Sequence, residues 1–274
     1  MPKNTNNREI AEAHEVTALR LLDRIGWARA QDLAHAVWPH AQQKLRIAQR
    51  VVRRLRDRHE ILSATAYGGI PIYTLAAAGV RRLADLGIAA HHGKDTLRDV
   101  QLPRAAHRML GNEFLIWITQ NEPGSCPIFE HEIAARRAGL HPDLRKIPDG
   151  LIIHPGTQDT TWIEVERARK AEKNYGPLLD HLLHLGAIDP LEIAPDRTMT
   201  DTIIVGQPRD FRRMIKALRE RVEHDDWHAQ VLMDNPGLLR FARRLGPYDF
   251  VMDDLAAAIA EFDAVEAEKL APAT

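Results

Sequence analysis

The chain has 274 residues, 45% of them apolar and 27% charged, with a formal net charge of −1. This length allows a substantial core and favours two domains over one. The single cysteine, Cys126, excludes an internal disulfide and a cysteine-based zinc finger, and we expect it to be buried. The sequence has no run of about 18 uncharged apolar residues and no signal-peptide pattern, which predicts a cytoplasmic protein without a membrane span.

Charge is distributed unevenly along the chain. Residues 1–90 contain 14 Lys and Arg against 8 Asp and Glu, a balance of +6. The remainder contains 23 against 30, a balance of −7. This split indicates a basic module that meets an anion, joined to an acidic module with another task.

Three helices are expected in the basic module. Residues 8–24 carry apolar side chains at near-helical spacing, residues 29–38 form a short helix that Pro39 ends, and residues 42–59 form the third. Arginines gather on one side of the third helix, opposite an apolar stripe. The apolar stripe consists of Leu45, Ala48, Val52 and Leu55, and the candidate DNA contacts are Lys44, Arg46, Arg50, Arg53 and Arg54.

A hairpin is expected directly after the third helix. The segment ILSATAYGGIPIYTL has two β-prone runs around Gly68 and Gly69. Three helices followed by a hairpin is the order of a winged helix-turn-helix domain, which we place at residues 8–88. In such a domain an arginine-rich third helix binds double-stranded DNA. An arginine-rich helix can also be a solvated surface, and winged helices also dock proteins.

Residues 89–104 are expected to form a linker, and residues 105–235 a second module. The predicted order of elements is α-β-β-β-α-β with further elements at its end, which favours an α/β fold with helices on both faces of a mixed sheet. The expected helices span residues 106–119, 168–185 and 209–222, and the expected strands span residues 127–134, 149–154, 160–166, 201–206 and 229–233.

Three carboxylates are expected to meet in this module. Glu164 and Glu166 alternate with apolar residues in one strand and therefore share a face, and Asp149 opens the neighbouring strand. Carboxylates brought together repel one another unless they share a cation. The oxygen donors favour Mg²⁺ or Mn²⁺, which activates water for attack on a phosphodiester.

These residues resemble the PD-(D/E)xK nuclease superfamily, in which a PD pair on one strand precedes (D/E)xK on the next. Here the matching residues are Pro148-Asp149 and Glu164-Val165-Glu166. The resemblance implies a restriction-endonuclease-like fold in which the two acids bind the metal and a Lys assists the attacking water. The sequence departs from this pattern because Glu166 stands in place of the Lys, and Lys170, four residues on, is a candidate replacement.

A closer resemblance is to the plasmid replication-relaxation family, in which a winged helix precedes a nuclease-like domain. It covers residues 15–210 and includes a Glu-rich strand with Glu130 and Glu132, then Asp149, the Glu164, Glu166 and Lys170 block, and Tyr175. This family is similar to MobC-type relaxases, so the resemblance implies a role in plasmid replication or conjugation. We also consider Glu113 as a site residue, although a position on the helix surface is favoured for it.

Residues 236–274 are expected to be a helical extension that closes the core or pairs with a second copy in a homodimer. Two functions fit the sequence. In one, the protein binds duplex DNA and nicks or cleaves a strand with a divalent metal. In the other, it is a regulator of transcription, replication or transfer whose nuclease-like domain is inactive and serves as a dimerisation or partner surface.

Overall fold

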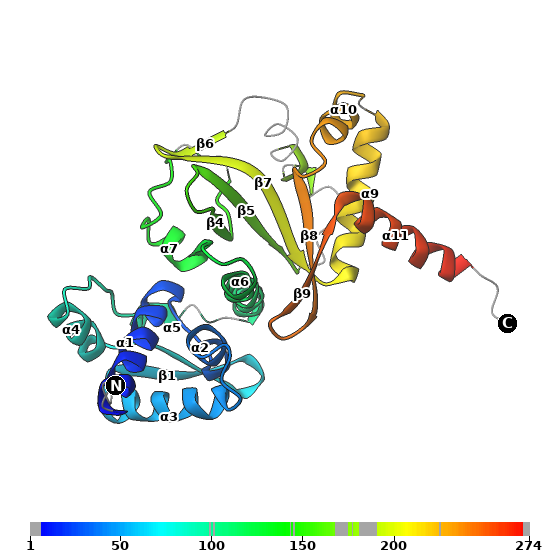
Figure 1. Ribbon diagram of the computed structural model, residues 1–274. Coiled ribbons are helices and arrows are strands. Elements are labelled where there is room, and N and C mark those ends of the chain that lie inside the picture. Colours follow the sequence, from blue (N-terminus) through cyan, green and yellow to red (C-terminus); the bar gives the residue numbers. More distant parts are fainter. Residues whose placement is uncertain are drawn as a thin grey trace, which may run out of the picture.

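Three helices followed by a two-stranded hairpin form the N-terminal module of the computed structural model, in the order expected from the sequence (Figure 1). The hairpin is antiparallel, and its turn contains Gly68, whose φ of 77° lies in the region that favours glycine. Tyr73 of the hairpin also pairs with Ala28, which ties the hairpin to the segment between the first two helices. The elements are α1 (Asn7–Ile25), α2 (Ala30–Val37), α3 (Lys44–Asp57), β1 (Ile61–Ala66), η1 (Tyr67–Gly69), β2 (Ile70–Leu75) and α4 (Ala77–Asp85).

The chain is a mixed α/β protein over the residues that the structure describes. These are residues 7–98, 100, 102–142, 144, 146–167, 175–176, 178–180, 191–224 and 226–270. Lys170 and most of the helix expected over residues 168–185 lie outside them. Within these ranges, no helix combines the length and the apolar character needed to cross a membrane.

A seven-stranded mixed sheet forms the centre of the second module. Its main path runs in the order β3-β4-β5-β7-β8-β9, and β6 pairs with β7 beside this path. The strands β3, β4 and β5 are antiparallel neighbours, whereas β7 is parallel to both β5 and β8. The strands are β3 (Cys126–Phe129), β4 (Gly150–Ile153), β5 (Asp159–Glu166), β6 (Leu191–Ala194), β7 (Arg197–Gly206), β8 (Leu239–Gly246) and β9 (Asp249–Asp254).

Helices cover both faces of the sheet (Figure 1). The strand β5 is buried on both sides, so its alternate residues enter different clusters: Ile163 packs with Phe114 of α6, and Trp162 packs with Phe211 of α9. Glu164 and Glu166 have the same parity as Trp162 and belong to the α9 face. The covering helices are α6 (Leu102–Asn121) on one face, and α9 (Pro208–His224), α10 (Asp226–Asp234) and α11 (Leu255–Leu270) on the other.

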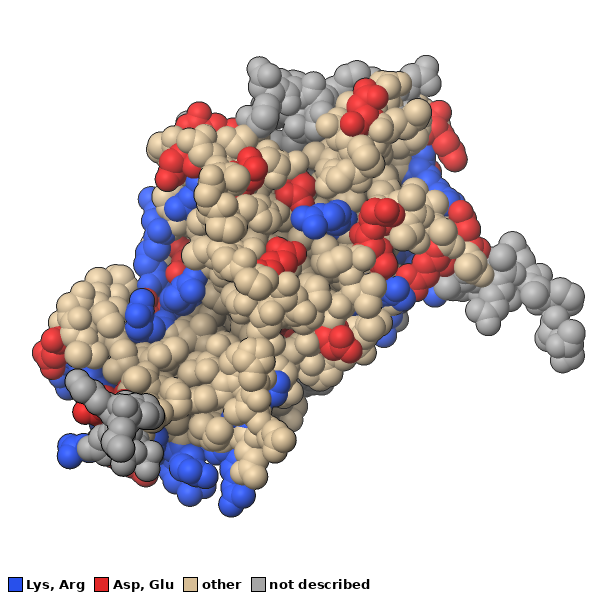
Figure 2. All heavy atoms as spheres, viewed as in Figure 1, with Lys and Arg blue, Asp and Glu red and all other residues tan. Residues whose placement is uncertain are grey.

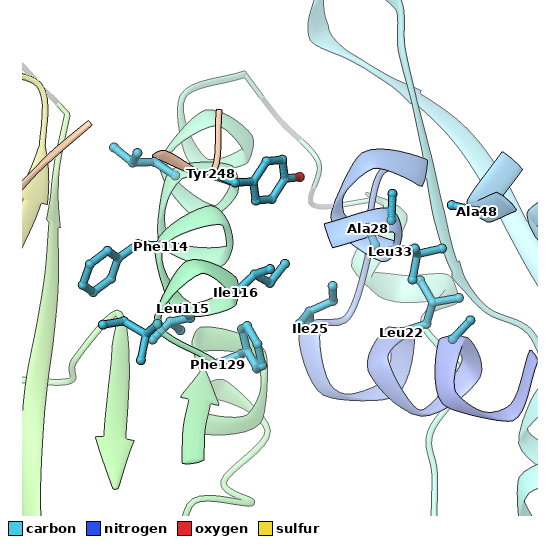
Figure 3. Close-up of a cluster of buried hydrophobic side chains, with 14 of the residues drawn as sticks. Leu22, Ile25, Ala28, Leu33, Ala48, Phe114, Leu115, Ile116, Phe129 and Tyr248 are labelled. Atoms are coloured by element: carbon cyan, nitrogen blue, oxygen red, sulfur yellow. The ribbon is translucent and has the colours of Figure 1, made fainter. Parts of the chain in front are cut away.

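The two modules share one hydrophobic cluster. Leu22 and Leu33 of the N-terminal module belong to the same cluster as Phe114 and Ile163 of the second. Figure 3 shows α6 between the sheet and the helices of the N-terminal module, with Ile116 directed toward the side of Ile25 and Leu33. Because burial of this shared apolar surface stabilises both modules, we expect them to unfold together.

Two segments expected to be strands contain helices. The strand expected at residues 127–134 ends at Phe129, and α7 (Glu130–Ala134) follows because the Glu132 carboxylate accepts a hydrogen bond from the Phe129 N–H, as in a helix cap. The strand expected at residues 229–233 lies within α10. A short apolar run fits a strand and a buried helix equally well, which explains the second error.

Three other expectations are also corrected. The expected linker contains α5 (Lys94–Arg98), and the C-terminal extension is helical only from Leu255, because β8 and β9 join the sheet before it. In α3, Leu45 is 43% exposed and Val51 takes its place in the buried stripe. Cys126, expected to be buried, is exposed at the start of an edge strand.

Candidate functional site

Asp149 and Glu164 face each other across the antiparallel pair of β4 and β5. The register pairs Gly150 with Ile163, which places Asp149 opposite Glu164. The Asp149 N–H donates to the Ile163 carbonyl at 3.0 Å, and the Val165 N–H donates to Asp149 Oδ2 at 2.8 Å. The backbone of β5 therefore fixes the orientation of the Asp149 carboxylate.

His107 of α6 forms an ion pair with Asp149. The distance from His107 Nε2 to Asp149 Oδ1 is 3.0 Å. Burial is the largest single influence on both side chains and disfavours their charged forms. The attraction between them, with the added effect of Glu130 and Glu164 on His107 and of the Val165 N–H and Lys146 on Asp149, nevertheless raises the pKa of His107 and lowers the pKa of Asp149. No local sequence pattern indicates His107, because its contact with Asp149 depends on the packing of α6 against the sheet.

Lys146 forms an ion pair with Glu164. The Glu164 side chain is nearly fully buried, so a neighbouring cation offsets much of the cost of keeping it charged. The expected position for a lysine was the residue two or six places after Glu164. The observed lysine comes instead from the segment before β4, three residues ahead of Asp149.

Glu130 extends the cluster at the start of α7. Burial raises the pKa of the Glu130 carboxyl, and the negative charge of Asp149 adds to this effect, whereas the nearby Arg108 opposes it. The side chains of His107, Glu130, Asp149 and Glu164 are therefore electrostatic neighbours. We refer to these four residues with Lys146 as the acid cluster.

Glu166 and Tyr175 lie deeper than the acid cluster. Glu166 has no exposed surface, and Tyr175 is 1% exposed. Burial raises the pKa of Tyr175 to about 12, and the charge of Glu166 contributes to the rise. Tyr175 is therefore protonated at neutral pH.

The acid cluster supplies oxygen donors of the type that Mg²⁺ and Mn²⁺ prefer. Within the part of the chain that the structure describes, however, no three His, Cys, Asp or Glu side chains are placed to hold one metal ion. His107 and Lys146 already provide positive charge to Asp149 and Glu164. The arrangement as it stands is a self-neutralised cluster, and no chemical step through a metal follows from it.

Glu113 and Glu132, the two other acids considered from the sequence, lie at the interface of the modules. Glu113 is 2% exposed and pairs with Arg29 and Arg244, so the favoured surface position is wrong. Glu132 pairs with Arg24 of α1 at 2.9 Å. Both carboxylates join helices of the N-terminal module to the second module rather than entering the acid cluster.

The exposed face of α3 carries the candidate DNA contacts. Arg46, Arg50 and Arg53 are exposed, and none of them has an ion pair with another described residue. Figure 2 shows Lys and Arg along the edge of the molecule where α3 lies in Figure 1. Arg54 differs from these three, because its Nε lies 2.9 Å from the Glu15 carboxylate.

Lys44 is also partly engaged, since its Nζ lies 3.3 Å from Nδ1 of His35. The five predicted contacts thus divide into three exposed arginines and two residues with partners in the protein.

Comparisons of the chain with protein-family models, curated proteins and solved structures give no match. The functional argument therefore depends on the acid cluster and on the α3 surface.

Proposed function

We propose that the chain is a DNA-binding protein of plasmid or mobile-element replication or transfer. Its N-terminal module would act as a winged helix-turn-helix, with α3 on duplex DNA. The observation that carries the proposal is the exposed row of Arg46, Arg50 and Arg53 on a helix whose opposite face is buried and which a hairpin follows. Cations without internal partners are available to phosphates and guanine edges.

We further propose that the second module is nuclease-like and nicks or cleaves DNA with Mg²⁺ or Mn²⁺. The order α6, β3, β4, β5 and then β7 parallel to β5 supports this proposal, because these elements occur in the same order in the PD-(D/E)xK superfamily. In this chain α7 follows β3 and β6 precedes β7, and most of the helix expected between β5 and β7 lies outside the described residues. Asp149 directly precedes β4 and lies opposite Glu164 on β5, and this arrangement supports a PD-(D/E)xK site. In this proposal Lys146 or Lys170 supplies the lysine of the motif.

A second candidate function has its own observation. The ion pairs of Lys146 with Glu164 and of His107 with Asp149 occupy the two acids that would bind a metal. If both ion pairs persist when the protein is bound to DNA, the protein is a regulator. Its nuclease-like module then has a structural or partner-binding role. Winged-helix proteins often bind DNA as dimers, so a homodimer belongs to both candidates.

One experiment separates these functions. Supercoiled plasmid is incubated with the protein and Mg²⁺ or Mn²⁺, and the same assay is run with Asp149→Ala and Glu164→Ala. Metal-dependent nicking that both substitutions abolish supports the nuclease. Nicking that survives both, or a protein that binds DNA and never nicks it, rejects the nuclease in favour of the regulator.

DNA binding is tested separately by replacing Arg46, Arg50 and Arg53 with Ala. The matched control is Arg20→Ala, which removes an exposed arginine from α1. We expect the triple variant to lose affinity and to show a weaker dependence of affinity on salt, because fewer phosphate contacts release fewer counterions. Equal DNA affinity of the triple variant and the control would show that α3 is not the DNA-binding surface.

A further inference from the structure

A cavity of about 510 Å³ lies between α9, α10 and the start of α11. These helices cover the face of the sheet opposite α6, and the N-terminal module packs on α6, so the cavity and α3 are on different sides of the sheet (Figure 1). Among the described residues that line the cavity, none belongs to α3 or to the acid cluster. A ligand bound there would therefore not compete with either.

The wall of the cavity is apolar and continues the core of the second module. Leu218 is 3% exposed, and Leu232 and Ile259 pack against the same hydrophobic cluster. At the mouth, Met233 is 73% exposed and Ala256 is also exposed, so the cavity opens to solvent. Pockets of roughly 300–1,000 Å³ with apolar walls and a few charged groups are typical of small-molecule sites.

Two carboxylates lie at the rim of the cavity. Asp254 caps α11, because its Oδ1 accepts a hydrogen bond from the Ala257 N–H at 2.7 Å. Glu223 lies in the last turn of α9. Both residues are exposed, and neither forms an ion pair with another residue in the described ranges. Their negative charges are therefore available to a ligand.

The remaining charges around the cavity do not cancel this negative rim. Arg219 also lines the cavity, but its Nη2 lies 2.6 Å from Oδ2 of Asp263, so its charge is paired within the protein. The last turns of α9 and α10 reach the lining at Glu223 and Met233, and helix C-termini carry partial negative charge. The N-terminus of α11 would favour an anion, but Asp254 already caps it. The rim therefore favours a cation.

We propose that this cavity binds a small apolar molecule that carries one cationic group, of the alkylammonium class. The apolar part of the ligand lies against the wall that contains Leu218 and Ile259, and its ammonium group lies at the rim with Glu223 and Asp254. Burial of the alkyl surface supplies affinity, and the two carboxylates select the sign of the charge. The proposal does not depend on DNA binding and gives the second module a ligand of its own.

The test is isothermal titration calorimetry of the full chain with three probes that share one alkyl chain. The probes are decylammonium, decanol and decanoate, each used below the concentration at which it forms micelles. We expect decylammonium to bind several-fold more tightly than decanol, because only the ammonium group is attracted to the rim. Decanoate should bind most weakly, because its charge is repelled there.

The rim is tested with the double variant Glu223→Gln, Asp254→Asn. It should lose the preference for decylammonium over decanol and keep the affinity for decanol. Asparagine also caps helices, so α11 should remain folded in this variant. The control is Glu220→Gln, which removes an exposed carboxylate of α9 that does not line the cavity. We expect this control to keep the preference for decylammonium.

The place of binding is tested with two variants of α11. Ala256→Trp adds a large side chain at the mouth of the cavity, whereas Ala260→Trp adds it at an exposed position outside the lining. We expect Ala256→Trp to weaken binding of decylammonium and decanol alike, and Ala260→Trp to leave both affinities unchanged. Melting temperatures of both variants close to that of the wild type would show that neither fold is disturbed.

Several results would overturn the proposal. These are equal affinity for decylammonium and decanoate, no binding of either, or equal affinity of the two tryptophan variants for decylammonium. If the probes do not bind and sedimentation shows a dimer that Ala256→Trp dissociates, the cavity is a contact between copies of the chain and the proposal is wrong. The DNA-binding assays with the α3 variants have no bearing on these results, so the two proposals fail independently.

Discussion

Arg29 and Glu113 lie 84 residues apart in the sequence, and their side chains form an ion pair of 2.8 Å between the two modules. Arg29 also donates to Asp32 at 2.6 Å and to the Tyr248 hydroxyl at 2.9 Å. Arg244 donates to the other oxygen of Glu113 at 2.9 Å. These five residues form a polar network between α2, α6 and the turn of β8 and β9, most of it buried.

Removal of Glu113 is expected to destabilise both modules together. Glu113→Ala leaves Arg29 buried beside fewer carboxylates, and loss of one partner of a buried ion pair costs about 3–5 kcal/mol. The free energy of unfolding is measured by urea denaturation. The control is Glu12→Ala, which removes an exposed carboxylate 3.9 Å from Arg82. It should change the free energy of unfolding by less than about 1 kcal/mol. A loss below about 1 kcal/mol for Glu113→Ala would contradict the importance of this network.

Arg53 and Arg54 are adjacent in α3, and we expect them to have different roles, one in DNA binding and the other in stability. Arg53 is exposed, so Arg53→Ala should weaken DNA binding and leave the free energy of unfolding nearly unchanged. Arg54 pairs with the buried Glu15, so Arg54→Ala should mainly lower stability. Affinity and urea denaturation are compared for both variants, and a larger affinity loss for Arg54→Ala would reverse the assignment.

The module interface is expected to weaken in acid. Burial, together with the positive charge of Lys44, lowers the pKa of His35 from 6.5 to about 4, and burial with Arg108 lowers that of His131 to about 4. Both histidines are neutral when folded, so their contribution to stability is present above pH 6.5 and is lost as pH falls from 6.5 toward 4. His35 stacks on Tyr248, and His131 lies close to Gly26.

The measurement is the free energy of unfolding between pH 7.5 and 4.5 for the wild type and for the variant with His35→Gln and His131→Gln. The wild type should lose more stability than the variant over this range, because glutamine does not titrate. Parallel curves for the two proteins would show that these histidines do not cause the acid sensitivity.

Lys146 is expected to compete with a divalent cation. Lys146→Gln removes the positive charge beside Glu164, so Mn²⁺ should raise the melting temperature of this variant more than that of the wild type. Binding at 100 times the Kd stabilises by about 2.7 kcal/mol. When Asp149→Asn is combined with Lys146→Gln, the larger rise in melting temperature with Mn²⁺ should be lost. If Mn²⁺ shifts neither protein, the acid cluster is not a metal site, which supports the regulator.

Local patterns in the sequence predict part of this structure well. The helices and hairpin of the N-terminal module and the strand alternation around Glu164 follow from spacing alone. The acid cluster required more than spacing, because His107 and Lys146 approach Asp149 and Glu164 only after α6 and the segment before β4 take their places on the sheet. Glu113 was misplaced for a similar reason, since its partners Arg29 and Arg244 are distant in sequence.

The strands β8 and β9 were missed because charged residues interrupt the apolar pattern of FARRLGPYDF. In the structure Arg243 pairs with Asp253 on the neighbouring strand at 3.0 Å, so these charges are satisfied across the sheet. A single-sequence pattern does not contain that pairing. The turn between these strands carries Tyr248, which completes the polar network of the interface.

The shared core and the polar network connect the module that contains α3 to the module that contains the acid cluster. If α3 binds duplex DNA as proposed, the contacts of the second module would lie at a set number of base pairs from the α3 site. Any strand break made by the acid cluster would therefore appear at one fixed offset. Loss of the Arg29 to Glu113 ion pair would broaden that offset into a range.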